Sequence, residues 1–329
     1  MKVCVFGAGA IGSNLAVRLI RAGKAEVSVV TRGAHLAAIR ARGLTLRAEG
    51  RDVTERPVAA TDDPDTLPPQ DCVIVTLKAH STPGVAGQIA RLLAPDAFAV
   101  FAVNGIPWWW HYGLAGRAAP ATSLLLLDPG GDLWSAVGPE RTLGCVVDSA
   151  NVVLEPGLVL NKRSNDWTLG EPDGSVSERL QWAQSLFSNE GQRAIVAKDI
   201  RHEVLCKLAF NVGNSPVSAL TCLSTYHTGN DPALRELKRG LMAEVVAIAA
   251  ALGWDIRDRV DPVKASQPMG VALGSKPSML QDILAGRSIE VEAILGQPLA
   301  MARQAGVATP LLEIVCTLAR GRDRALRAG

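Results

Sequence analysis

The first part of the chain alternates short apolar runs with segments of helical spacing. Runs rich in β-branched and apolar residues predict buried strands at residues 3–6, 26–30, 71–77 and 97–103. Apolar residues at helical spacing follow the first run and end at Gly23, and further helices are expected at 35–42 and 85–93. This alternation predicts an α/β fold built on a doubly wound parallel sheet.

Weaker patterns extend that sheet. The other elements expected in this part are strands at 44–46, 53–58, 143–154, 157–160, 166–170 and 192–197 and a helix at 176–189. Turn residues around Gly50 and Gly157 separate paired runs, and the polar segment 62–69 is expected to be a loop.

The pattern changes after Asp199 and becomes mainly helical. Helices are expected at 200–209, 234–252, 278–286, 289–305 and 310–326. The chain is therefore expected to form two domains, residues 1–197 and 198–329, the second all-helical. Since no Ser/Gly-rich linker marks the boundary, we expect the two to pack closely.

A glycine-rich loop joins the first strand to the first helix. It is formed by Gly7, Ala8, Gly9, Ala10, Ile11 and Gly12. Gly7 allows a tight turn, Gly9 allows close approach of a pyrophosphate, and Gly12 allows helix and strand to pack together. The helix N-terminus would hold the phosphates. Strand, loop and helix in this order indicate a Rossmann-type dinucleotide-binding domain rather than a simple Gly-rich turn.

The end of the second predicted strand bears on the choice of dinucleotide. An acidic residue there would bind the adenosine ribose of NAD, but the chain has Thr31 and Arg32. An arginine can pair with the 2′-phosphate of NADP, so NADP(H) is the expected cofactor. The alternative for Arg32 is a solvated surface side chain.

Polar residues follow two more of the predicted strands. Lys78 and Asn104 stand where the runs 71–77 and 97–103 end, and such strand ends point at the ligand crevice of an open α/β sheet. Lys78 could equally be a solvated strand-end lysine. The three tryptophans at 108–110 point in different directions, so some are expected in the core while one could line a pocket.

Composition narrows the class of protein. The chain has 329 residues, 48% hydrophobic and 20% charged, with a net charge of +2, so neither nucleic-acid nor membrane binding is expected. Six scattered cysteines without a CxxC pair indicate reduced, buried thiols, and five histidines without ligand spacing predict no metal site. With no secretion signal apparent, we expect a cytoplasmic protein.

The second part contains a few polar residues in apolar surroundings. Lys207 and Asn211 are one turn apart on a largely apolar helix, where a lysine is costly unless it has a function or reaches the surface. Ser278 is a plausible helix N-cap, and Glu290 begins the next helix. Spacing alone does not show that these groups converge.

These motifs together resemble one known family. GAGAIG at 7–12, Arg32, LKA at 77–79, NG at 104–105, KLAFN at 207–211 and SMLQDI at 278–283 followed by Glu290 occur in the order seen in ketopantoate reductases of the PanE/ApbA type. The resemblance covers nearly the whole chain. It implies a Rossmann domain that binds NADPH, a helical substrate domain, and reduction of a 2-keto acid such as 2-dehydropantoate to pantoate in pantothenate biosynthesis.

The resemblance also implies residue roles. Lys207 would be the general acid and Glu290 would orient it, which suits protonation of a developing alkoxide. Asn104, Asn211 and Ser278 would bind substrate, and the glycine loop, Arg32 and Lys78 would bind cofactor, with Asn104 near both. Members occur as monomers and dimers, so either state is expected.

The chain departs from the family pattern at two places that bear on the substrate. The family usually has a second asparagine four residues after the Asn211 position, where this chain has Ser215, the substrate-binding residue expected there. The tryptophan run is also unusual. A bulkier or less hydroxylated 2-keto acid is therefore an alternative substrate.

Two other functions would place different demands on these residues. A same-fold dehydrogenase of a phosphorylated substrate would call for a basic cluster near Lys207, and none is apparent. A non-catalytic NADPH-binding redox sensor would need neither Lys207 nor Glu290.

Overall fold

The computed structural model describes residues 1–114, 124–268, 270 and 275–328. The chain divides into two compact units. The first, here called the sheet unit, comprises Met1–Val103 and Trp108–Ile200, and the second, the helical unit, comprises Asn104–Pro107 and Arg201–Gly329. The loop Asn104–Pro107 thus groups with residues that follow it by almost a hundred positions in sequence.

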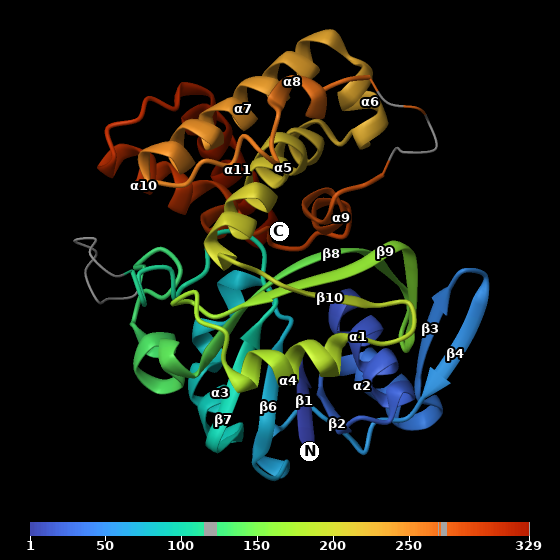
Figure 1. Ribbon diagram of the computed structural model, residues 1–329. Coiled ribbons are helices and arrows are strands. Elements are labelled where there is room, and N and C mark those ends of the chain that lie inside the picture. Colours follow the sequence, from blue (N-terminus) through green and yellow to red (C-terminus); the bar gives the residue numbers. More distant parts are fainter. Residues whose placement is uncertain (115–123, 269, 271–274, 329) are drawn as a thin grey trace. The chain divides into compact units, whose positions relative to one another are not determined.

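The sheet unit is built on one mixed sheet (Figure 1). Its strands are β1 (Lys2–Phe6), β2 (Glu26–Val30), β3 (Leu44–Ala48), β4 (Arg51–Glu55), β5 (Ala59–Thr61), β6 (Gln70–Val75), β7 (Leu93–Phe101), β8 (Thr142–Glu155), β9 (Leu158–Gly170) and β10 (Arg193–Val196). The strands β5-β2-β1-β6-β7-β8 are parallel neighbours in that order. This is the doubly wound order, with the direction of winding reversing between β1 and β6. The predicted fold class is confirmed.

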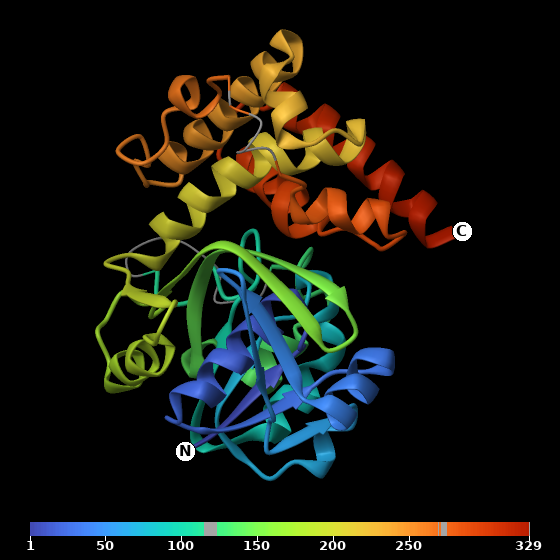
Figure 2. The same ribbon diagram turned by 90° about the vertical axis from the view of Figure 1, so that its right-hand side faces the viewer.

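The long hairpin β8–β9 extends and curls this sheet. It is antiparallel, and the outer edge of β9 pairs in parallel with both β3 and β10. Figure 2 shows the green hairpin bending strongly. The sequence predicted two separate strands where β9 is continuous, because the intervening residues 161–165 are polar and hide the pattern. It also missed β5, which begins two residues after Pro57, a residue that cannot donate to a strand ladder.

Helices cover the sheet. The α-helices of this unit are α1 (Ala10–Ala22), α2 (Gly33–Arg42), α3 (Ala86–Leu92) and α4 (Glu178–Phe187). Short 3₁₀ turns lie at Pro64–Thr66, Ala79–Ser81, Pro83–Val85 and Pro139–Arg141, and a π-helical turn lies at Leu133–Val137. Helix α1 ends at Gly23 as expected, with φ +64°. The core joins α1 residues such as Leu15 and Leu19 to strand residues such as Val5, Ile74 and Trp167.

All three residues of the tryptophan run are buried in the sheet unit. Trp108, Trp109 and Trp110 are 3%, 1% and 2% exposed. Trp108 packs edge-to-face on Phe101 with ring centroids 5.4 Å apart, and a Cβ at Gly144 would lie 2.6 Å from a Trp109 ring carbon. This packing favours the core interpretation of the run over the pocket one.

The helical unit contains α5 (Ile200–Thr221, whose first residue belongs to the sheet unit), α6 (Thr225–Asn230), α7 (Pro232–Ala251), α8 (Pro262–Ala265), α9 (Ser278–Leu284), a π-helical turn (Glu292–Gly296), α10 (Gln297–Gln304) and α11 (Pro310–Ala328). Figure 2 shows α11, in red, running to the C-terminus. Its first turn is capped by the Glu244 carboxylate of α7, which accepts from the Leu311 and Leu312 amides at 2.9 and 2.8 Å.

Two helix predictions were wrong in their bounds. Helix α5 was expected to end at residue 209 but continues through Pro216 to Thr221. A buried helix tolerates the proline because tertiary packing offsets the one lost hydrogen bond. The predicted helix 289–305 begins instead with a π-helical turn, and Pro298 marks the change to α10.

Candidate active site

The glycine loop of the sheet unit combines a tight turn at Gly7 with open space at Gly9. Gly7 has φ +107°, and a Cβ there would lie 2.7 Å from a Leu77 methyl carbon. A Cβ on Gly12 would collide with the Gly7 carbonyl and with Thr76 Oγ1. At Gly9, the N-cap of α1, a Cβ would meet no described atom within 4 Å. Open space therefore lies above Gly9, where the unbonded first-turn amides of α1 can meet an anion.

The loop is held by the strands on both sides of β1. The amides of Gly7 and Ala8 donate to Val30 O at the end of β2, at 2.9 and 3.1 Å. On the β6 side, Thr76 Oγ1 donates to Gly7 O at 2.7 Å. Since β1 and β6 form the point where the winding reverses, the loop lies at the crevice where ligands of such sheets bind.

A chain of hydrogen bonds links the glycine loop to α2 and to the turn between β8 and β9. Ser13 of α1 donates to Ala8 O at 2.9 Å and contacts His35 Nε2 of α2 at 3.1 Å. His35 Nδ1 accepts from the Gly157 amide at 3.1 Å. The ring is therefore neutral, with its proton on Nε2 donated to Ser13. Burial lowers the pKa of His35, which favours the same neutral form.

The other cofactor candidates of the sheet unit follow β2 and β6. Arg32 is the N-cap residue of α2 and is exposed, and it forms no ion pair with any residue the structure describes. Helix α2 has no acidic residue in its first turn that would oppose an anion. Lys78 is half-buried and precedes the 3₁₀ turn Ala79–Ser81.

Asn104 belongs to the helical unit although it follows β7. Its neighbour Gly105 has φ +85°, and the Ile106 amide donates to Ala293 O at 2.8 Å. The strand expected at 97–103 ends at Phe101, so Asn104 lies three residues beyond it, in a loop that packs on the segment after Glu290. Long-range packing of this kind leaves no trace in the local pattern of residues 104–107.

Helix α5 carries three of the expected residues on one side. Lys207, Asn211 and Ser215 follow one another at intervals of one turn. Lys207 and Asn211 are half-buried and Ser215 is 6% exposed. The lysine therefore lies among apolar residues while keeping part of its surface open, which suits a group that must meet a ligand.

Glu290 and Ser278 differ in their surroundings. Glu290 is 5% exposed and directly precedes the helical segment that begins at Val291. The preceding amide, Ile289 N, donates to the Asp323 carboxylate of α11 at 2.8 Å and fixes the backbone there. Ser278 is exposed and is the first residue of α9, whose N-cap is Pro277, so its predicted capping role is wrong.

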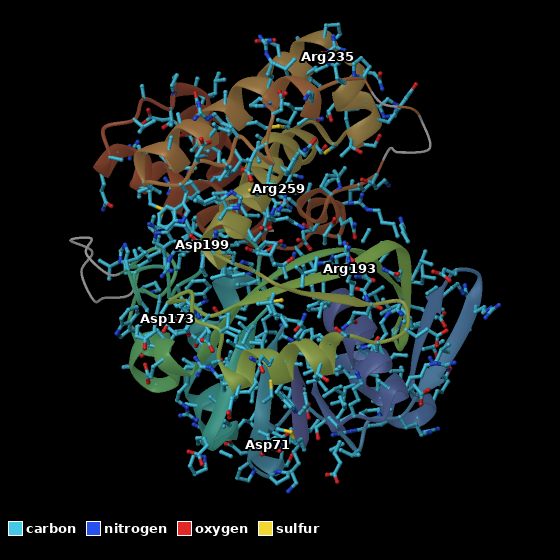
Figure 3. All side chains as sticks on the ribbon, in the orientation of Figure 1. Asp71, Asp173, Arg193, Asp199, Arg235 and Arg259 are labelled. Carbon is cyan, nitrogen blue, oxygen red and sulfur yellow. The ribbon has the colours of Figure 1, made fainter. Side chains whose placement is uncertain are left out.

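A second set of reactive residues precedes Lys207 on α5. Cys206 Sγ lies 3.7 Å from His202 Nδ1, and His202 Nε2 lies 3.2 Å from Asp258. Nearby, Arg259 (labelled in Figure 3) donates to Glu203 at 3.1 Å. Burial raises the pKa of Cys206 to about 12, so its thiol is a poor nucleophile despite the Cys–His–Asp sequence of contacts.

Thr76, Ser13 and His35 were not among the residues predicted for the site. Thr76 lies inside the predicted strand 71–77, but the observed strand β6 ends at Val75, so Thr76 is the first residue after it. Nothing in the sequence pairs Ser13 with His35.

Within the described ranges, no group of three or more His, Cys, Asp and Glu is arranged to hold a metal ion. In the same ranges, no helix is long and apolar enough to cross a membrane.

Comparison with known proteins gives a consistent result. Residues 3–174 match the model of the family described as Ketopantoate reductase PanE/ApbA, and residues 199–323 match that of its C-terminal domain. A 2-dehydropantoate 2-reductase from Mesorhizobium japonicum is 39% identical over 321 residues, covering 97% of each chain.

Solved structures agree in fold. A structure from Ralstonia solanacearum MolK2, provisionally named a ketopantoate reductase, is 33% identical with a TM-score of 0.88 and covers 98% of each chain. The 2-dehydropantoate 2-reductase of Methylococcus capsulatus is 26% identical with a TM-score of 0.80, covering 99% of this chain and 98% of that one. The chain described here belongs to the ketopantoate reductase family of oxidoreductases.

Proposed function

We propose that this protein reduces a 2-keto acid to the 2-hydroxy acid with NADPH, and that 2-dehydropantoate (ketopantoate) is its substrate in pantothenate biosynthesis. The observation that carries the proposal is Lys207, a half-buried lysine on α5 with Asn211 one turn away, in a chain 39% identical to a 2-dehydropantoate 2-reductase. In this proposal the sheet unit binds the cofactor and the helical unit provides the substrate and acid groups.

The residues present fit a dinucleotide. Gly9 leaves room for a phosphate next to the first-turn amides of α1, and the close contacts of Gly7 and Gly12 fix the loop. The crevice between β1 and β6 is the usual place for the nicotinamide half. Arg32 would hold the 2′-phosphate of NADPH, since it is exposed at the end of β2 where NAD-binding chains have an acid. Lys78 would contact the ribose next to the nicotinamide.

When bound, NADPH supplies the hydride that adds to the C2 carbonyl carbon of the keto acid. Lys207 would donate a proton from its ammonium group to the carbonyl oxygen as negative charge develops there. Glu290 would accept a hydrogen bond from Lys207 and orient it. Asn104, Asn211 and Ser278 would hold the carboxylate and hydroxyl groups of the substrate, which fixes the reacting carbon.

Ser215 favours a second candidate substrate. A hydroxyl there is shorter than the asparagine usual at this position, so it leaves room for a bulkier or less hydroxylated 2-keto acid. The fold alone allows this, because a D-mandelate dehydrogenase structure with NADH and anilino(oxo)acetate superposes with a TM-score of 0.81 at 20% identity.

Steady-state NADPH oxidation tests the proposal. Purified protein is assayed with ketopantoate, ketoisovalerate, an aromatic 2-keto acid and no substrate, and NADH is tested in parallel. We expect the highest kcat/KM with ketopantoate and NADPH. Turnover with another keto acid alone would move the assignment to that substrate. Tight NADPH binding without turnover on any of them would favour a redox sensor instead.

A further inference from the structure

The loop that carries Asn104 is attached to a π-helical turn of the helical unit. Within Asn104–Pro107, the Ile106 amide donates to Ala293 O at 2.8 Å, and Ala293 lies in the π-helical turn Glu292–Gly296. Ile106 is 1% exposed and Ala293 is 3% exposed, so this hydrogen bond is shielded from water. A shielded backbone bond of this kind has few competitors and fixes its partners firmly.

The π-helical geometry explains why the Ala293 carbonyl is available. In this turn the Gln297 amide donates to Glu292 O, five residues earlier. The next bond of the same ladder would join residue 298 to Ala293 O. Residue 298 is proline and has no amide hydrogen, so the Ala293 carbonyl is left for a donor from outside the helix. Ile106 is that donor.

Gly105 is required by the same contact for two reasons. Its φ of +85° lies in the region that favours glycine. A Cβ at this position would also collide with the Ala293 carbonyl group and would lie 2.8 Å from Ala293 Cβ. The backbone of the loop therefore packs directly against the Ala293 carbonyl group, where a side chain at position 105 would not fit.

The π-helical turn is itself anchored on its other side. The Glu292 carboxylate accepts two hydrogen bonds from Arg320 of α11, at 2.8 and 2.6 Å. One residue before Glu290, the Ile289 amide is bound to Asp323, also on α11. Glu290 stands between these two anchored points, and Ala293, which holds the Asn104 loop, is three residues away.

We propose that Gly105 and Pro298 are positioning residues that lock the loop carrying Asn104 onto the π-helical turn that follows Glu290. Asn104 and Glu290 are then both held by the same segment of the helical unit. This inference rests on the proposed function, in which both residues act on the keto acid. It predicts that the substrate contact of Asn104 depends on the Ala293 carbonyl, which Pro298 leaves available to the Ile106 amide.

The test uses Pro298→Ala, which restores an amide that competes for Ala293 O. We expect amide hydrogen exchange of Asn104, Gly105 and Ile106 to become at least tenfold faster. We expect kcat/KM for the keto acid to fall about tenfold. The Kd for NADPH, measured by fluorescence, should stay within twofold. Pro310→Ala, at the first residue of α11, is the matched control and should change none of these values. Gly105→Ala should give the same pattern more strongly.

A double variant separates positioning from a general structural effect. If the turn acts through Asn104, adding Pro298→Ala to Asn104→Ala lowers kcat/KM no further. Additive losses would overturn the proposal, as would unchanged exchange at residues 104–106 in Pro298→Ala. If the wild type reduces no keto acid, the proposed function fails, while hydrogen exchange still decides whether Pro298 controls the loop.

Discussion

Lys238 of α7 is a buried lysine that the proposed chemistry does not use. It is 1% exposed and its ammonium forms no ion pair or hydrogen bond with the described residues. Burial lowers its pKa, since the charged form is poorly solvated there. At neutral pH this lysine therefore costs stability.

Replacing Lys238 by methionine should stabilise the protein by on the order of 1 kcal/mol near pH 7. The pKa of Lys238 is lower in the folded protein than in the unfolded chain. The loss of stability caused by this lysine is therefore largest below the folded pKa and fades as the pH rises toward the ordinary lysine value. Urea unfolding at pH 7 and pH 9.5 measures this, and the advantage of Lys238→Met should shrink at the higher pH. A methionine variant less stable than wild type at both pH values would show that the ammonium is favourably bound.

Gly9 and Gly12 provide a matched pair of variants in one loop. Gly12→Ala places a Cβ against Gly7 O and Thr76, and should lower the free energy of unfolding by about 1–3 kcal/mol. Gly9→Ala meets no described atom within 4 Å, and φ at Gly9 is −79°, so stability should stay within about 0.5 kcal/mol.

The same Gly9→Ala variant should bind NADPH about tenfold more weakly, because its methyl group occupies the space proposed for the phosphates. Denaturant unfolding and fluorescence titration give the two quantities separately. Equal NADPH affinity in Gly9→Ala and wild type would place the phosphates elsewhere.

At the scale of elements, His35 connects α1, α2 and the β8–β9 turn. It does so only as a neutral ring, which accepts from the Gly157 amide and donates to Ser13. Burial lowers its folded pKa below the ordinary value near 6.5. The contribution of His35 to stability is therefore present above that ordinary value and is lost as pH falls through the folded pKa.

The variant His35→Gln should thus be destabilised relative to wild type at pH 8 but much less so at pH 5. Urea midpoints at both pH values measure the difference. A loss of equal size at pH 5 and pH 8 would mean that the ring charge has no part in joining these elements.

Several elements could be predicted from their own residues and several could not. The first two strands, α1 and the Gly23 cap follow from local patterns. The strands bury runs that are mainly β-branched and apolar, and α1 ends at a glycine with positive φ. The continuous strand β9 and the π-helical turn could not be predicted from local patterns, because both depend on partners far away in sequence.

At the scale of the whole molecule, the change to a helical pattern after Asp199 predicted two units. The motifs along the chain predicted the family. The grouping of Asn104–Pro107 with the helical unit could not be predicted from the sequence. The residues of this loop do not indicate it, because the contacts involved, such as the hydrogen bond from Ile106 to Ala293 O, join segments far apart in sequence. Of the site, the residue types at strand and helix ends were predictable, while their supporting residues, such as Thr76 and His35, were not.

The most direct test of the central claim compares wild type with Lys207→Ala in NADPH oxidation with ketopantoate, together with the NADPH Kd of each. If Lys207 is the acid of a keto-acid reductase, kcat falls roughly 10²-fold or more while the Kd for NADPH stays within about twofold. A Lys207→Ala variant that turns over ketopantoate at the wild-type rate would contradict the account.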